Sequence, residues 1–398
     1  MNTLKKIYCR AFQLGFKIAL PFLPYRQPKL VDGFKEIPAI LKKKGITSAL
    51  IVTDPGVYKL NLTKDLEEIL EKNGIHPAVY KDTVANPTTA NVEEARQVYI
   101  NKDCNALIAV GGGSAMDCAK GVGIRIARPN KPLGHFEGIL KVRRRIPLLI
   151  AVPTTAGTGS ETTLTAVITD SKTLHKYPIN DFFLIPDYAV MQPEITFGLP
   201  PFFTATTGMD AMTHAVEAFI GNTTTRGTEA ASIKAVKLIS HNLITAYKEP
   251  ENKKARGNML KAAYLAGTAF TKSYVGYVHA VAHSLGGQYG IPHGLANSVL
   301  LPIVLRQYGQ HAYKRLAILA RKTGISQSED DKTAALAFIS HIEKMNKALD
   351  IPEKLEGIKE KDIPKLAKYA DKEGNPLYPV PVLWDAKELE KLYRLVMI

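Results

Sequence analysis

Five potential metal ligands lie in two short segments of the C-terminal half. Asp210 and His214 are four positions apart, as are His279 and His283, so each pair projects from one face of a helix. His293 follows ten positions later. A single buried histidine is best explained as a hydrogen-bonded core residue, but burying this group without partners would be costly, and a divalent metal removes that cost. A carboxylate with two or three imidazoles suits Fe(II), Zn(II), Mn(II) or Co(II).

Two glycine-rich turns, each after an apolar run, suit the binding of phosphate. Residues 111–114 (GGGS) allow close backbone approach, and the helix predicted to follow offers free N–H groups and a positive dipole end. Residues 153–161 (PTTAGTGSE) contain Thr154, Thr155 and Thr158, whose hydroxyls can bind phosphate or ribose. Open α/β sheets bind nucleotides at the carboxyl ends of their strands, so the two turns together predict a nucleotide site. The alternative is an ordinary tight turn at each position.

Asp54 ends the first clear strand. A carboxylate there can accept hydrogen bonds from an adenosine ribose and repel a 2′-phosphate, which favours NAD over NADP. A plain turn residue explains a lone aspartate equally well.

The elements that position these residues fall into two regions. Between residues 28 and 195, short β-rich runs such as 48–54 and 106–110 alternate with helical patterns, which predicts parallel strands and crossover helices. Residues 196–398 show helical periodicity almost throughout. We therefore expect an α/β domain followed by an all-helical domain.

Composition is that of an ordinary globular protein. The 398 residues are 45% hydrophobic and 22% charged, which excludes collagen-like and largely disordered chains. Of the net charge of +15, +8 lies in residues 1–47, which have ten basic and two acidic side chains, and no nucleic-acid-binding motif accompanies it. Three cysteines without a CxxC pair predict no disulfide framework and a reducing cytoplasm. The sequence contains no run of 18 apolar residues, so we expect no membrane-spanning helix.

Residues 1–27 form a basic N-terminal extension. Its apolar stretch, residues 7–24, is interrupted by Arg10, Gln13 and Lys17, unlike the core of a cleaved signal peptide. We expect an amphipathic helix that packs on this protein's own surface or on a second subunit. Peripheral contact with anionic lipid is the alternative.

Four motifs, in the expected order, resemble the iron-containing (group III) alcohol dehydrogenase family. They are GGGSAMDCAK, PTTAGTGSE, GMDAMTHAVEAF and HAVAHSLGGQYGIPHGLANSVLLP. The resemblance runs from about residue 28 to the C-terminus, and the histidine motif is its most specific part. It implies a Rossmann-like nucleotide-binding domain (28–195), an all-α metal-binding domain (196–398) and a homodimer.

The resemblance also implies roles for individual residues. The metal ligands would be Asp210, His214, His279 and His293, with His283 beside them assisting proton movement. The cofactor contacts would be Gly112, Gly113 and Ser114 at the pyrophosphate, Asp117 on the same helix, Thr154, Thr155 and Thr158 in the second turn, and Asn86, Lys176 and Asp54. Ala115 departs from the family, where proline is common after GGGS.

These features predict reversible hydride transfer between NAD(H) and a primary alcohol or aldehyde, with Fe(II) or Zn(II) polarising the substrate oxygen. A polyol dehydrogenase of the glycerol or propanediol type is the alternative on the same scaffold. An inactive binding or scaffold relative is less favoured, because every matched position is intact. A dehydroquinate synthase is further away, since no Lys or Arg interleaves with the ligand motifs.

Overall fold

Apolar segments pair as the parallel sheet that the sequence predicts. In the computed structural model, which describes residues 1–398, six strands run in the order β1-β9-β6-β4-β2-β3, all pairs parallel. They are β1 (Lys29–Val31), β2 (Ser48–Val52), β3 (His76–Tyr80), β4 (Ala106–Gly111), β6 (Leu148–Pro153) and β9 (Tyr188–Val190). The central strands β2 and β4 are buried throughout, because both of their faces are apolar and covered by helices.

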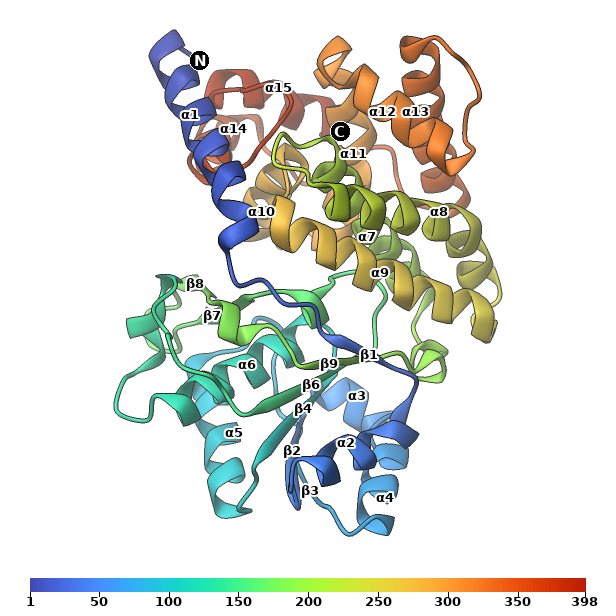
Figure 1. The fold of residues 1–398 in the computed structure, drawn as a ribbon. Helices are drawn as coiled ribbons and strands as arrows, with labels where there is room; N and C mark the ends of the chain where they lie inside the picture. The colour runs from blue at the N-terminus through green and yellow to red at the C-terminus, as the bar shows by residue number, and fades with distance from the viewer. The chain divides into compact units, whose positions relative to one another are not determined.

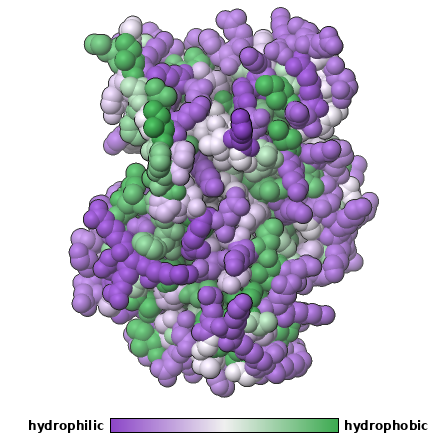
Figure 2. Space-filling view, in the orientation of Figure 1, coloured by the Kyte–Doolittle hydropathy of each residue, from purple (hydrophilic) through white to green (hydrophobic).

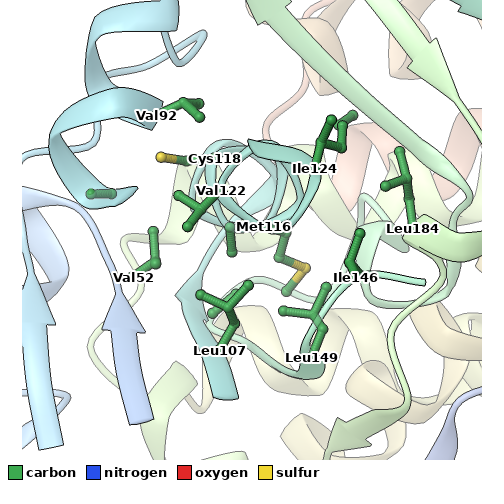
Figure 3. Close-up of a cluster of buried hydrophobic side chains, with 14 of the residues drawn as sticks. Val52, Val92, Leu107, Met116, Cys118, Val122, Ile124, Ile146, Leu149 and Leu184 are labelled. Atoms are coloured by element: carbon green, nitrogen blue, oxygen red, sulfur yellow. The ribbon is translucent and has the colours of Figure 1, made fainter. Parts of the chain in front are cut away.

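Helices cover both faces of this sheet (Figure 1). One face packs against α2 (Ile37–Lys43), α3 (Pro55–Lys59) and α4 (Lys64–Lys72), and the other against α5 (Thr89–Asn101) and α6 (Gly113–Ala127). Figure 3 shows Met116 and Val122 of α6 among Leu107, Leu149 and Ile146. A smaller sheet, β5-β8-β7, contains β5 (Gly138–Ile139), β7 (Thr165–Thr169) and β8 (Lys176–Asn180).

The second unit is helical. Its central helix, α7 (Pro201–Ile220), is buried along nearly its whole length and packs against α8 (Arg226–Lys248), α9 (Lys253–Ser273) and α11 (His293–Tyr308). The remaining helices are α10 (Tyr277–Tyr289), α12 (Gln310–Thr323), α13 (Asp331–Ala348), α14 (Ile363–Gly374) and α15 (Ala386–Val396). The predicted order of an α/β region followed by a helical one is confirmed. None of the helices is long and apolar enough to cross a bilayer.

The units divide the chain at residues 23/24 and 198/199, so residues 1–23 belong with 199–398. The second division lies slightly beyond the expected residue 195, because Ile195 packs in the core of the α/β unit and α7 begins only at Pro201. Helix α1 (Thr3–Ala19) packs on the helical unit: Gln13 is buried and its amide donates to Tyr378 O at 2.8 Å. The sequence-based interpretation of residues 1–27 as one separate extension therefore differs from this division.

Candidate metal and nucleotide sites

Four of the predicted ligands come together in the helical unit. Asp210 and His214 project from α7, His279 from α10, and His293 from the first position of α11. One ligand atom from each lies within 4.8 Å of the others. Asp210 Oδ1 is 3.8 Å from His279 Nε2 and 3.4 Å from His293 Nε2. One anionic oxygen with three imidazoles fits a divalent transition metal, and a water-accessible side remains because 39% of the His293 side chain is exposed.

Glu217, which the sequence analysis missed, fixes the orientation of His279. Its buried carboxylate accepts hydrogen bonds from Gly276 N at 2.8 Å, Val278 N at 2.8 Å and His279 Nδ1 at 2.6 Å. Burial raises the pKa of Glu217 to about 8, while hydrogen bonds from the backbone N–H groups of Gly276, Val278 and His279 lower it. The contact places the imidazole proton on Nδ1 and leaves Nε2 for the cluster. Its spacing, three positions after His214 and seven after Asp210, is the sequence signal that could have found it.

Asn297 is a second missed residue. It is fully buried, and its Nδ2 lies 2.7 Å from Asp210 Oδ1, 3.0 Å from His293 Nε2 and 3.2 Å from His279 Nε2. Its Oδ1 has no hydrogen-bond partner. The amide therefore lies among the ligand atoms, one helical turn beyond His293, and an unsatisfied buried oxygen at this place also fits a site built to hold a cation.

His283 lies beside the four ligands and outside their cluster. Its ring stacks on His293 with centroids 5.1 Å apart, and 44% of its side chain is exposed. Its Nδ1 is 2.6 Å from Glu373 Oε1 on α14, and the same oxygen accepts from Tyr378 Oη at 2.7 Å. Burial acts to raise the pKa of Glu373, but the charge and hydrogen bond of His283 lower it overall. Nothing in the sequence places Glu373, ninety positions away, against this histidine.

The two glycine-rich turns lie side by side. Gly111 pairs with Pro153 at the carboxyl ends of β4 and β6, and Thr154 N donates to Gly111 O at 3.1 Å. A Cβ on Gly112 would lie 3.8 Å from Thr155 Oγ1, and one on Gly113 would lie 3.8 Å from Thr158 Cγ2. Helix α6 begins at Gly113, so its free N-terminal N–H groups lie beside the second turn.

Three more predicted cofactor residues meet beside the first turn. Asn86, with a positive φ of 57°, donates from its backbone N to Ser114 Oγ at 3.3 Å. Lys176 Nζ donates to Asn86 Oδ1 at 2.7 Å. Burial lowers the pKa of Lys176, while the charge of Asp117 raises it. Asp117 accepts from Ser160 Oγ at 3.4 Å, and burial raises its pKa to about 6.

Asp54 caps a helix at the end of β2. Its Oδ1 accepts from Val57 N at 3.0 Å, which is the N-cap bond of α3. The other carboxylate oxygen faces the first turn, since a Cβ on Gly111 would lie 3.4 Å from Oδ2. Asp54 can therefore cap α3 with one carboxylate oxygen and still offer the other to a ribose.

Lys120, which the sequence patterns did not single out, links α6 to the second turn through hydrogen bonds. It is fully buried, and its Nζ donates to the carbonyls of Ser160, Thr163 and Thr165 at 2.9, 3.0 and 2.9 Å and to Thr163 Oγ1 at 2.8 Å. Burial lowers its pKa to about 8, although Asp117 raises it. Its place in the motif GGGSAMDCAK gave no hint that it reaches residues 160–165.

Comparison with known proteins finds one family across both units. The family model described as iron-containing alcohol dehydrogenase matches residues 31–193, and that for the C-terminal region of the Fe-containing alcohol dehydrogenase family matches 204–397. Helix α1 precedes both matches. Alcohol dehydrogenase 4 of Saccharomyces cerevisiae (strain ATCC 204508 / S288c) is 38% identical over 342 residues, covering 85% of this chain and 88% of that protein.

Two further similarities involve named activities. The 1,3-propanediol dehydrogenase of Klebsiella pneumoniae is 38% identical over 389 residues, covering 95% of this chain and 98% of that protein. The crystal structure of a 1,3-propanediol oxidoreductase superposes with a TM-score of 0.89 at 34% identity, covering 94% of this chain and 99% of that chain.

Proposed function

Since the chain belongs to the iron-containing alcohol dehydrogenase family, whose enzymes use NAD(H) and a divalent metal, we propose that Asp210, His214, His279 and His293 hold that metal during reversible alcohol oxidation. The observation that carries this proposal is the convergence of four donor atoms within 4.8 Å. When bound, the ion, Fe(II) or Zn(II), supplies a Lewis acid that polarises the alcohol or aldehyde oxygen.

The chain's own residues orient the groups around that centre. Asp210 brings the negative charge, and Glu217 holds His279 with Nε2 turned toward the cluster. His283 takes the hydroxyl proton of the alcohol at Nε2. Glu373 accepts a hydrogen bond from Nδ1–H and so stabilises the imidazolium that results. In aldehyde reduction the same imidazole returns the proton.

At the nucleotide end, we propose that Gly112, Gly113 and Ser114 at the start of α6 bind the pyrophosphate through backbone N–H groups. The hydroxyls of the second turn (Thr154, Thr155 and Thr158), the Asn86–Lys176 pair and Asp117 line the cofactor, and Asp54 binds the adenosine ribose. The negative charge of Asp54 favours NAD(H) over NADP(H).

The substrate class we propose is a primary alcohol and its aldehyde. A diol of the propanediol type is a second candidate, favoured by the similarity to two proteins named for 1,3-propanediol. We further propose a homodimer in a reducing cytoplasm, in keeping with three free, buried cysteines.

The test is anaerobic aldehyde reduction with NADH or NADPH, on protein stripped of metal and reloaded with Fe(II) or Zn(II). We expect turnover only after reloading, with NADH preferred. Stoichiometric metal binding without reduction of aldehydes, and without oxidation of 1,3-propanediol or glycerol, would contradict the proposal. Turnover confined to NADPH would keep the reaction and remove Asp54 as the selecting residue.

A further inference from the structure

Helix α1 presents its apolar face to solvent. The side that contacts the helical unit carries Cys9 and Gln13, both buried. The opposite side carries apolar residues at intervals of three, seven and four positions, which remain 59–80% exposed: Leu4, Ile7, Leu14 and Ile18. In Figure 2, drawn in the orientation of Figure 1, hydrophobic surface coloured green runs along α1. An apolar row of this kind on a single helix indicates a binding surface.

Polar contacts hold α1 in this orientation. The Arg10 guanidinium donates to Val380 O at 2.8 Å and to Pro381 O at 2.9 Å, and the Gln13 amide donates to Tyr378 O at 2.8 Å. Turning the apolar row inward would break these bonds. The row is therefore available to a partner while α1 stays packed on the protein.

The charge beside the row selects the partner. Lys6 and Lys17 are exposed and lie along one flank of α1, eleven positions and so about three turns apart; Arg10 lies between them, with its guanidinium bound to the carbonyls of Val380 and Pro381. The helix has no acidic residue, and no carboxylate pairs with Lys6 or Lys17. A groove of about 600 Å³ opens beside this flank and is lined by Lys6, Ile7, Arg10, Ala11, Leu14, His311 and residues 381–383.

From this geometry we propose that α1 docks the protein on an anionic lipid surface. The apolar row enters the boundary between headgroups and acyl chains, and the cationic flank binds acidic headgroups. The spacing of the row would also suit pairing of two α1 helices, but each helix would bring the same cations and no acidic side chain of its own, and the nearby Asp371 already pairs with Lys5. Helix α1 precedes the segments that match the family and contributes no residue to the candidate metal cluster.

Flotation of the full chain with vesicles tests the proposal. We expect binding to phosphatidylcholine vesicles that contain one quarter phosphatidylglycerol, little binding to pure phosphatidylcholine, and weaker binding as salt rises. The double variant Leu14→Glu/Ile18→Glu should lower binding at least about tenfold. Lys6→Glu/Lys17→Glu should lower it at least about fivefold for each lysine.

Matched controls separate docking by α1 from attraction to the overall net charge. Lys332→Glu/Lys347→Glu on α13 makes the same change in charge, and Ile139→Glu/Leu174→Glu changes exposed apolar residues of the α/β unit. Both controls should bind within about twofold of the unchanged protein, and every variant should keep its helical circular dichroism. Equal loss in the controls, or no preference for anionic vesicles, would overturn the proposal. The proposal would also be overturned if the protein did not bind vesicles and its mass in solution halved in Leu14→Glu/Ile18→Glu, because the apolar row would then join two copies of the chain.

Discussion

The proposed metal cluster and the proposed nucleotide turns would hold their ligands in different ways. The cluster consists of side-chain atoms from three helices, and the carboxylate of Glu217 holds the His279 ring in place. The turns would bind through backbone N–H groups and glycines, and the register of β4 on β6 and the contacts of Lys120 fix their shape. Function at the cluster therefore depends on single atoms, whereas at the turns it depends on the shape of a segment. Substitutions should be severe at the first and graded at the second.

Removal of one ligand gives the largest expected effect. His279→Ala should lose the metal and lower kcat/KM at least about a thousandfold, because several kcal/mol of electrostatic stabilisation disappear with the ion. Metal per chain by elemental analysis and NADH oxidation measure both losses. His283→Ala, in the adjacent turn of α10, is the matched control and should retain metal while its turnover falls. Full turnover in metal-free His279→Ala would contradict the assignment of the cluster.

Loss of the residue behind a ligand should be milder. Glu217→Gln replaces the carboxyl group that contacts His279 Nδ1 with an amide, which orients the ring less well, so metal affinity should fall about 10- to 100-fold. Competition with a chelator measures that affinity. Glu229→Gln, at a partly exposed carboxylate of α8 that pairs with Arg315 of α12, is the control and should leave the metal affinity unchanged. A lower melting temperature with unaltered metal affinity would show that Glu217 only supports the fold.

Lys120 tests the nucleotide end of the comparison. Lys120→Met leaves three buried carbonyls without their donor, so the second turn should loosen and KM for NADH should rise about tenfold while metal content stays constant. The control is Lys72→Met, at an exposed lysine of the same unit. Unchanged NADH affinity in Lys120→Met would remove the positioning role.

The lowered pKa of Lys120 predicts that the stability of the protein depends on pH, and Lys120→Met serves as the comparison. Burial lowers the pKa of Lys120 to about 8 in the folded protein, against 10.5 for an ordinary lysine. Between these values the unfolded chain binds more protons, so the contribution of Lys120 to the free energy of unfolding rises with pH, by at most about 1.4 kcal/mol per pH unit. Denaturant titrations from pH 7 to about 10.5 should show the unchanged protein gaining stability relative to Lys120→Met. Parallel curves would contradict the lowered pKa.

The sequence predicted what local spacing determines. The i, i+4 pairs of α7 and α10 and the glycines after β4 are readable because a helix or a turn converts their spacing directly into geometry. The parallel sheet and the helical region were predictable for the same reason.

Contacts between distant segments were not predictable in this way. Lys120 reaches carbonyls 40 to 45 positions later, and Glu373 meets His283 across 90 positions. Only the packing of α6 against the second turn, and of α14 against α10, brings these groups together. The orientation of α1 was not predictable either. A helical wheel identifies its apolar side, but it does not show that the opposite side, with Gln13, is the one that is buried.

The smallest expected effect separates the two roles of Asp54, which caps α3 and faces the first turn. Asp54→Asn keeps an oxygen that can cap the helix and loses the charge, so thermal stability should hold while discrimination against NADPH weakens about tenfold. Asp54→Ala should lose both, with about 1 kcal/mol of stability from the missing cap. The ratio of kcat/KM for NADH and NADPH, measured beside thermal melts, distinguishes them. An unchanged ratio in both variants would leave Asp54 as a cap alone, and cofactor choice would then depend on the shape of the turns instead of a single charge.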